Sequence, residues 1–270
     1  MTEGPEVIVL PDAATVAAEA AERIAAAARD AVDARGTAHW MTTGGSNPTD
    51  IYRRLATRPL RDTVPWQGVH IWWTDDRYVP RDHPLSNVKP LDDVLINLAG
   101  AEEGTHLGGG GEPGVPIALE HLHPFRTAEA IGEARGPAWA AEMMAAELAG
   151  AGLEQRDGWP VMDLVLLGLG GDGHLLSVFP GSAVFDSTAW TAAVPAPTHI
   201  EPHVERVTMH PSVIPAARGV LMVVTGASKV DAVRHVLGDT RDERRWPGQV
   251  AAIDGAVWLL DAAAAAGLPG

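Results

Sequence analysis

The stretch MDLVLLGLGGDGH, residues 162–174, joins an apolar run to a glycine-rich turn that carries Asp172 and His174. The run Met162–Leu169 is typical of a β-strand that is buried on both faces, as in a parallel sheet covered by helices. In open parallel sheets, ligands bind outside the carboxyl ends of the strands. The stretch therefore predicts the type of sheet and places a candidate site at the turn that follows.

Elsewhere, short apolar runs alternate with longer stretches of helical period. Strands are expected at Val7–Leu10, His39–Thr43, Val69–Trp73, Gly219–Val224 and Ala256–Leu260, and helices at Ala13–Val32, Pro48–Ala56, Pro90–Leu98, Pro137–Leu148 and Ser228–Leu237. Asp12 and Ser228 are the expected N-caps of the first and last helix. Strands that alternate with helices imply right-handed βαβ units. We expect an α/β fold with a doubly wound, mostly parallel, Rossmann-like sheet and helices on both faces. Residues 1–270 form one expected domain, with a glycine-rich surface insertion at about Gly100–Pro116.

The 270-residue chain carries 20 Lys and Arg against 35 Asp and Glu, a formal net charge of −15. Binding to nucleic acids or anionic membranes depends on basic surface, so neither class of partner is expected. No run approaches the roughly 18 apolar residues of a membrane span, and the start MTEGPEVIVLPD does not predict a signal peptide. The chain has no cysteine, which excludes disulfides, thiolate metal sites and cysteine nucleophiles. We expect a cytoplasmic protein in which an anionic substrate would need a local cluster of cations.

The first polar cluster, TGGSNPTD at residues 43–50, directly follows a predicted strand. Glycines let backbone N–H groups approach an anion closely, and the proline marks the start of a helix. A strand, a turn with Gly44, Gly45 and Ser46, and a helix N-terminus together predict a phosphate cradle. The alternative is a tight turn capped by Ser46 or Asn47.

The second cluster, DDR at residues 75–77, lies in an expected charged loop, Thr74–Pro80, after another strand. Two adjacent carboxylates beside an arginine form either a surface ion-pair turn or an acid–base group that also holds an anion. The position of Asp75 and Arg77 at the carboxyl end of a strand favours their membership of the site.

The turn Gly168–His174 matches the dinucleotide fingerprint G-x-G-x-x-G, but its context differs. A dinucleotide site needs an acidic residue on the next strand, and Asp186 comes too early. The glycines instead favour a tight turn that directs Asp172 and His174 into a cleft. A histidine at the end of a strand, with a carboxylate two residues away, suits a general base. The alternative is a histidine that caps backbone groups within the turn.

Two further cations are candidates for holding an anion. Lys229, one of two lysines in the chain, lies in TGASK at residues 225–229 near the start of a predicted helix. A lysine there is a poor partner for the helix dipole unless an anion is also present. Arg206, in ERVT at residues 205–208, is the second candidate. A solvated side chain is the alternative for Lys229.

Two histidine pairs, His121/His123 and His199/His203, have a spacing that occurs in metal sites. A structural zinc site needs four ligands, and neither pair has a third ligand in a recognisable motif. We therefore expect no metal and no cofactor.

Five motifs, taken in order, give the chain a resemblance to the 6-phosphogluconolactonase family. That family shares a fold group with glucosamine-6-phosphate deaminases and ribose-5-phosphate isomerases. The motifs are TGGSNP at 43–48, DDRYVPRDHPLSN at 75–87, GLGGDGHLLSVFPGS at 168–182, RVT at 206–208 and TGASK at 225–229. The resemblance covers about Val7 to Leu260. It implies a hydrolase that opens 6-phospho-D-glucono-1,5-lactone to 6-phosphogluconate in the oxidative pentose phosphate pathway.

By matching position, the resemblance implies a phosphate site made of Gly44, Gly45, Ser46, Arg206 and Lys229. The expected partner is a small phosphorylated sugar lactone, and the expected state is a monomer or weak homo-oligomer.

The resemblance also implies which residues face the lactone ring, namely Asp75, Arg77 and His174. His174 would be the general base. Either Asp172 or Asp75 would support it, and the sequence leaves that choice open.

The chain departs from the family pattern at several positions. Asp76 replaces a usual glutamate, Asn47 a threonine and Gly171 a proline, and Leu175-Leu176 stand where Thr-Ala is usual. The loss of the threonine hydroxyl beside the catalytic histidine predicts an altered hydrogen bond there.

Two alternative functions remain. A glucosamine-6-phosphate deaminase or isomerase would share the cradle and the D-G-H turn, but such enzymes carry a glutamate where this chain has Phe179. A non-catalytic sugar-phosphate sensor would keep the cradle without turnover, and the retained Arg77 and His174 argue against it.

Overall fold

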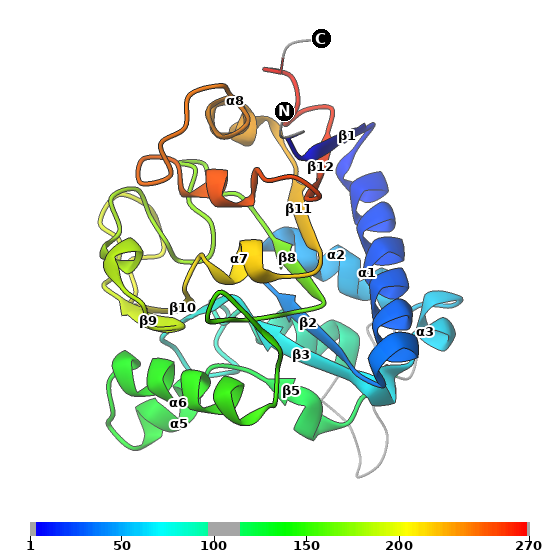
Figure 1. Cartoon of the computed structure of the whole chain (residues 1–270), viewed down its shortest axis with the longest axis vertical. Helices are drawn as coiled ribbons and strands as arrows, with labels where there is room; N and C mark the ends of the chain where they lie inside the picture. The colour runs from blue at the N-terminus through cyan, green and yellow to red at the C-terminus, as the bar shows by residue number, and fades with distance from the viewer. Residues whose placement is uncertain (1–3, 97–113, 269–270) are drawn as a thin grey trace.

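The computed structural model describes residues 4–96 and 114–268 (Figure 1). Its centre is a seven-stranded sheet with the strand order β1-β12-β11-β8-β2-β3-β5. The strands are β1 (Glu6–Leu10), β2 (Ala38–Thr42), β3 (Val69–Trp73), β5 (Leu122–His123), β8 (Leu164–Leu167), β11 (Val220–Val224) and β12 (Val257–Asp261). All neighbouring pairs in this sheet are parallel. The predicted doubly wound α/β fold is confirmed.

The order of the strands reverses between β2 and β8. From β2 the chain builds outward to β3 and β5, whereas β8 is followed by β11 and β12 on the other side. Ligands of doubly wound sheets bind at such a switch point, outside the carboxyl ends of the strands. Those ends are Thr42 and Leu167, which directly precede the predicted cradle and the predicted Gly168–His174 turn.

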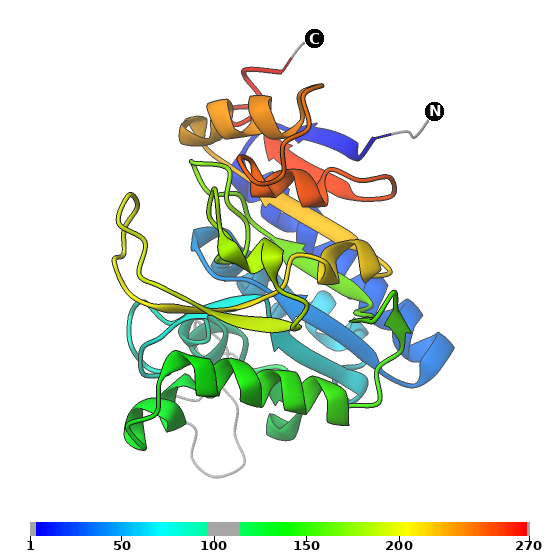
Figure 2. The same cartoon turned by 60° about the vertical axis from the view of Figure 1, so that its left-hand side comes forward.

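Helices lie on both sides of this sheet, with α1 and α6 on opposite sides (Figure 2). The helices are α1 (Ala13–Arg35), α2 (Ser46–Leu55), α3 (Leu60–Thr63), α4 (Lys89–Leu91), α5 (Thr127–Gly132), α6 (Pro137–Gly150), α7 (Val213–Ala216) and α8 (Val230–Val236). A π-helix spans Asp92–Ile96, and 3₁₀ turns span Trp66–Gly68, Leu119–His121, Ala183–Asp186, Ala227–Lys229 and Pro247–Ala251.

Helix α1 shows how local sequence sets these boundaries. The carboxylate of Asp12 accepts a hydrogen bond from the backbone N–H of Thr15 at 2.8 Å, as an N-cap does. Gly36 ends the helix in the left-handed region, at φ 81°. Between these caps, small and branched apolar side chains such as Val16 and Ile24 form the buried face.

A second, smaller sheet was not predicted. It is antiparallel, in the order β4-β10-β9, and consists of β4 (Asp75–Arg77), β9 (Thr191–Val194) and β10 (Arg206–Met209). The expected charged loop Thr74–Pro80 therefore contains a strand. A polar strand of three residues has too little apolar alternation to be recognised, and its pairing partner lies far along the chain. Helix α6 packs against this sheet (Figure 2).

Two predicted helices need correction. The expected helix Pro90–Leu98 is split into α4 and the π-helix, within the described residues. The expected helix Ser228–Leu237 begins as a 3₁₀ turn, and Ser228 does not cap it. The hairpin of β6 (Gln155–Arg156) and β7 (Trp159–Pro160) had not been predicted. The expected insertion at Gly100–Pro116 lies largely in residues 97–113, outside the described residues.

The two tryptophans of β3 pack into the core on the two faces of the sheet. Trp72 and Trp73 are fully buried and, as neighbours on one strand, point to opposite faces. Each indole N–H has a partner: Trp72 donates to Nδ1 of His39 at 3.2 Å and Trp73 to the backbone oxygen of Asn87 at 3.1 Å. The second bond anchors a loop that borders the site described below.

Among the described helices, none is long and apolar enough to cross a membrane.

Four histidines gather away from that site, on β2, β3, β5 and the turn before β5. His70 stacks on His39 and His121, with ring centroids 4.9 and 4.0 Å apart, and its Nδ1 lies 3.0 Å from Nε2 of His123. Nδ1 of His123 lies 2.5 Å from Glu147 on α6. Burial, together with the neighbouring histidines, lowers the pKa of His70 to about 4.

We expect this cluster to make the fold sensitive to acid. An unfolded chain protonates His70 near pH 6.5, whereas the folded chain does so only near pH 4. The unfolded state therefore binds the proton first, so the free energy of unfolding falls as the pH is lowered from about 6.5 to about 4. Urea unfolding across this range should show a steeper loss for the wild type than for His70→Phe. Equal slopes for the two proteins would contradict the prediction.

Candidate active site

A cavity of about 220 Å³ lies at the carboxyl ends of β2 and β8. Most of the predicted site residues line it: Gly44, Gly45, Asp75, Arg77, His174, Arg206 and Lys229. The sheet thus brings together segments that are far apart in the sequence. Asp172 contacts the site through its hydrogen bond to His174. Ser46 begins α2, and its side chain lies outside the described part of the structure.

His174 and Asp172 form a pair in the turn after β8. Nδ1 of His174 lies 2.5 Å from Oδ1 of Asp172, and the backbone N–H of His174 donates to the same oxygen at 3.2 Å. This leaves Nε2 as the ring nitrogen that can accept a proton in the cavity. A Cβ at position 170 would overlap the imidazole, so Gly170 provides the space for this pair. Gly173, at φ 82°, supplies the tight turn.

The carboxylate of Asp172 has a second imidazole partner, His199, which the sequence suggested only as one of a pair with metal-like spacing. Nε2 of His199 lies 2.9 Å from Oδ2 of Asp172. Burial would raise the pKa of Asp172, but the hydrogen bonds from His174 and His199 outweigh it and hold that pKa well below its usual range. Asp172 is therefore ionised at neutral pH.

Asp75, on β4, also lines the cavity. Its Oδ2 accepts a hydrogen bond from Oγ of Ser177 at 2.6 Å, and Nδ2 of Asn87 donates to its backbone oxygen at 2.8 Å. The backbone N–H of Ser177 donates to Oγ1 of Thr208 at 3.2 Å. Asp172, not Asp75, is thus the carboxylate that bonds to His174. The sequence motifs at 75–87 and 168–182 contain Asn87 and Ser177 but indicate no role for either residue.

Asp76 has a structural position, although it is adjacent to Asp75. It is fully buried, and its Oδ1 accepts from the backbone N–H groups of Arg77 at 2.8 Å and Asn87 at 2.7 Å. Burial raises the pKa of Asp76 to about 7, against the lowering effect of these two bonds. The carboxyl group fixes the segment that carries Asn87.

Arg77 and Arg206 stand directly opposite each other on β4 and β10. Nη1 of Arg77 donates to Oδ1 of Asn87 at 2.7 Å, and its buried Nε has no hydrogen-bond partner among the described residues. Nη2 of Arg206 donates to the backbone oxygen of Pro202 at 2.8 Å. Burial lowers the pKa of Arg206, and the charge of Arg77 adds to this effect. Like charges at facing positions are unfavourable, so an anion between them would be stabilised.

The turn after β2 approaches this cation pair. A Cβ at position 44 would overlap the side-chain amide of Asn87, so only glycine fits there. Gly45 has φ 102° and is the N-cap of the ten-residue α2, whose first backbone N–H groups have no helical partners. A turn of this kind at a helix N-terminus can bind an anion.

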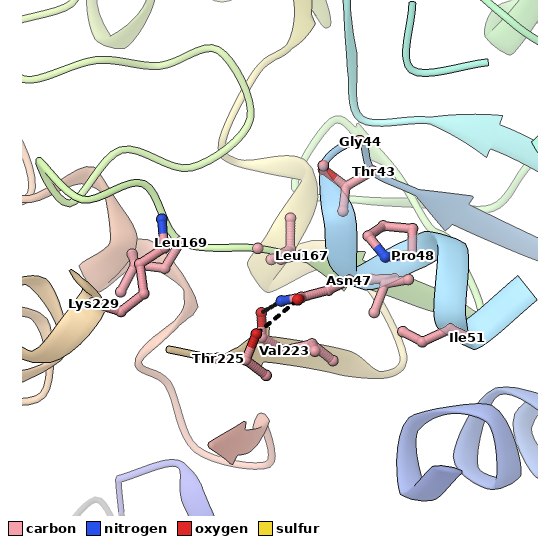
Figure 3. Close-up of a pocket in the computed structure, with 13 residues that line it drawn as sticks. Thr43, Gly44, Asn47, Pro48, Ile51, Leu167, Leu169, Val223, Thr225 and Lys229 are labelled. Carbon is pink, nitrogen blue, oxygen red and sulfur yellow. Dashed lines mark hydrogen bonds between the residues drawn. The ribbon is translucent and has the colours of Figure 1, made fainter. Parts of the chain in front are cut away.

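A smaller cavity of about 140 Å³ adjoins the cradle, between the start of α2 and the end of β11 (Figure 3). Nδ2 of Asn47 donates to the backbone oxygen of Val223 at 3.2 Å, and its Oδ1 accepts from Oγ1 of Thr225 at 2.8 Å. Asn47, a departure from the family pattern, therefore connects α2 to β11.

Lys229 lines both cavities. Burial lowers the pKa of Lys229, and the charge of Asp172 acts in the opposite direction.

Three apolar side chains lie beside the Asp172–His174 pair. Leu175 and Leu176 are buried, and Leu176 has φ 55°, a region that leucine rarely occupies. The ring of Phe179 lies 4.8 Å from that of His174 and 5.6 Å from that of His199, between centroids. The position where deaminases carry a glutamate is therefore occupied by an apolar ring against both imidazoles.

The two histidine pairs singled out for their spacing do not form metal sites in the described residues. No group of three or more His, Asp or Glu side chains there has a geometry that could hold a metal ion. His199 bonds to Asp172, and Nδ1 of His203 lies 2.7 Å from the backbone oxygen of Pro197. His121 and His123 belong to the remote cluster around His70.

Comparison with known proteins places this chain in a family. The family described as glucosamine-6-phosphate isomerases/6-phosphogluconolactonase matches residues 11–258. The 6-phosphogluconolactonase of Mycobacterium tuberculosis is 31% identical over 262 residues, which cover 97% of this chain and 97% of that protein. Among solved structures, 6-phosphogluconolactonase from Trypanosoma brucei is 26% identical with a TM-score of 0.80, covering 100% of both chains. The enzyme of that name from Trypanosoma cruzi shares the fold, with 23% identity, a TM-score of 0.83, and coverage of 100% of this chain and 99% of that one. With more than half of its length matched, the chain belongs to the glucosamine-6-phosphate isomerase/6-phosphogluconolactonase family.

Proposed function

We propose that this protein is a 6-phosphogluconolactonase, which hydrolyses 6-phospho-D-glucono-1,5-lactone to 6-phosphogluconate in the oxidative pentose phosphate pathway. The observation that carries the proposal is the ionised Asp172–His174 pair at the edge of a cavity that Arg77, Arg206 and Lys229 also line. A base and several cations in one cavity suit an anionic substrate with an electrophilic carbonyl. The relatives from Mycobacterium tuberculosis and Trypanosoma brucei, which match over 97% and 100% of this chain, carry that name.

His174 acts as the general base in this proposal. Nε2 takes a proton from a water molecule while the water oxygen forms a bond to the lactone carbonyl carbon. The Arg77 guanidinium stabilises the negative charge that develops on the carbonyl oxygen. When the intermediate collapses, the bond between that carbon and the ring oxygen breaks, and the His174 imidazolium returns its proton to the departing oxygen. Asp172 accepts from Nδ1 throughout and stabilises the imidazolium.

The phosphate occupies the cradle end of the cavity. Backbone N–H groups at Gly44, Gly45 and Ser46 face it, in line with the N-terminus of α2. Arg206 and Lys229 supply charge-assisted hydrogen bonds. The lactone ring then extends toward Arg77 and His174.

Deaminase chemistry is less well supported by this site. Opening an amino-sugar ring and moving a proton between carbons requires further acid–base groups near the histidine. Phe179, packed against His174, fills the position of the glutamate that deaminases carry there. A non-catalytic sensor would have no use for a base oriented by an ionised carboxylate.

The test is acid release from freshly prepared 6-phosphogluconolactone at constant pH, with spontaneous ring opening subtracted. We expect a rate that is proportional to protein concentration and that saturates with substrate. Ammonia release from glucosamine 6-phosphate is the matched assay for the deaminase. Activity in the second assay without the first would overturn the proposal, and binding of the lactone without acid release would indicate a sensor. A cytoplasmic location and a monomeric or weakly oligomeric state stay predictions.

A further inference from the structure

His199 reaches the catalytic pair from a loop, residues 195–205, which joins β9 to β10. The loop extends from the small sheet and is coloured yellow in Figure 2. Side chains hold its backbone: Arg206 donates to the oxygens of Pro202 and Val204, and His203 contacts that of Pro197. His199 is thus presented to Asp172 by an ordered segment.

The carboxylate of Asp172 lies between two imidazoles, one on each oxygen. Oδ1 is 2.5 Å from Nδ1 of His174, and Oδ2 is 2.9 Å from Nε2 of His199. An ionised carboxylate only accepts hydrogen bonds, so each of these ring nitrogens must carry a proton. These two hydrogen bonds therefore require a proton on Nδ1 of His174 and a proton on Nε2 of His199. Two donors in fixed directions leave the carboxylate little freedom to rotate.

The ring of Phe179 contacts both imidazoles. Its ring is tilted by 53° against His174 and lies at 90° to His199. The side chain of His199 is 49% exposed and does not line the cavity, although its neighbours Ile200 and Glu201 do. His199 is placed to act through Asp172 and not on the substrate.

We propose that His199 is a positioning residue, which fixes the Asp172 carboxylate for His174 and moderates the basicity of His174. Its effect on catalysis rests on the proposed lactonase function, whereas its effect on the protonation of His174 does not. By donating to Oδ2, His199 offsets part of the negative charge that stabilises the His174 imidazolium. Removal of His199 should therefore make His174 more basic.

The charged surroundings support this direction. Lys229, in the turn before α8, interacts electrostatically with Asp172. Glu201 lies two residues after His199 on the same loop and lines the cavity. Neither group is changed when His199 is replaced. The titration of His174 in a His199 variant thus reports on the contact to Asp172.

The test is NMR of the imidazole nitrogens in ¹⁵N-labelled full-length protein, over pH 5 to 9. His199→Ala removes the donor, His199→Gln keeps an amide donor near the Nε2 position, and His203→Asn is the control on the same loop. We expect His199→Ala to move the titration of His174 to higher pH, because the hydrogen bond that offsets the charge of Asp172 is lost. The Gln and His203→Asn variants should stay close to the wild-type value. An unchanged His174 titration in His199→Ala would overturn the proposal.

Kinetics on the lactone provide the second readout. In His199→Ala the acidic limb of the kcat/KM profile should move to higher pH together with the NMR value, and the plateau should fall about fivefold as the carboxylate loses one anchor. His199→Gln should restore the plateau. A fall in the plateau that Gln does not restore, without a shift of the acidic limb, would assign His199 to loop structure alone and contradict the proposal. A wild-type protein without lactonase activity would refute the proposed function, and the NMR comparison would still decide the role of His199.

Discussion

Replacing His174 with alanine is expected to lower kcat/KM for 6-phosphogluconolactone by about 10²–10⁴-fold, the usual contribution of a general acid–base group. His174 is the imidazole that lines the cavity and has an ionised carboxylate on its Nδ1. Without it, water must attack without a base and the ring oxygen must leave without a proton. The measurement is acid release at constant pH, with the uncatalysed rate subtracted.

Two controls make this result specific. The His174→Ala protein should keep the wild-type circular dichroism spectrum, because the side chain is partly exposed and belongs to a surface turn. Asp172→Asn should also lower kcat/KM strongly, since an amide can hold His174 in the wrong tautomer, as is known for the analogous aspartate in serine proteases. Lactone hydrolysis by His174→Ala at a rate near that of the wild type would exclude the proposed mechanism.

The central sheet could be predicted from local sequence because its signals are local. The apolar run of β3 is bounded by polar residues, and the predicted limits Val69–Trp73 agree with the structure. The residues that flank α1, Asp12 before it and Gly36 after it, define its two ends. Doubly wound sheets then place the loops that follow the strands at one edge. This rule is enough to gather Gly44, Arg77 and His174 into one cavity.

The rest of the site depends on contacts that no short stretch encodes. β4 is a strand only because β10 pairs with it from more than a hundred residues further along the chain, and this pairing sets Arg77 against Arg206. His199 reaches Asp172 only because the loop after β9 is held in place. The sequence assigns the His199/His203 pair no metal and no other role, because spacing reports neighbours in sequence and not the carboxylate of Asp172 across the site. The choice between Asp172 and Asp75 likewise required three-dimensional distances.

The net charge of −15 gives the few cations of the cavity their importance. A phosphorylated lactone approaches an acidic protein, so its binding relies on a local cluster of positive groups. Arg206 is buried and already engaged with backbone oxygens. Lys229 lines both the larger cavity that contains His174 and the smaller cavity beside the cradle. It is therefore the side chain whose removal should separate recognition of the phosphate from chemistry at the lactone.

Replacing Lys229 with methionine, which keeps the length of the chain and removes the charge, is expected to raise KM for the phosphorylated lactone by about 10- to 100-fold. This range corresponds to the loss of one hydrogen bond to a charged group, about 1.5–3 kcal/mol. Hydrolysis of unphosphorylated glucono-1,5-lactone should change little, because that substrate offers Lys229 no phosphate. The measurement compares KM and kcat for both lactones.

Lys89→Met is the matched control, because Lys89 is the only other lysine in the chain and pairs with Asp93 at 2.6 Å, outside the cavity. It should leave both lactones unaffected, so that any change in Lys229→Met reflects the position of the charge and not the total charge. Because kcat for the phosphorylated lactone depends on His174 and Arg77, it should fall much less than KM rises. If Lys229→Met impaired both lactones equally, the lysine would support the fold or the chemistry, and the phosphate would have to be held by Arg206 and the cradle without it.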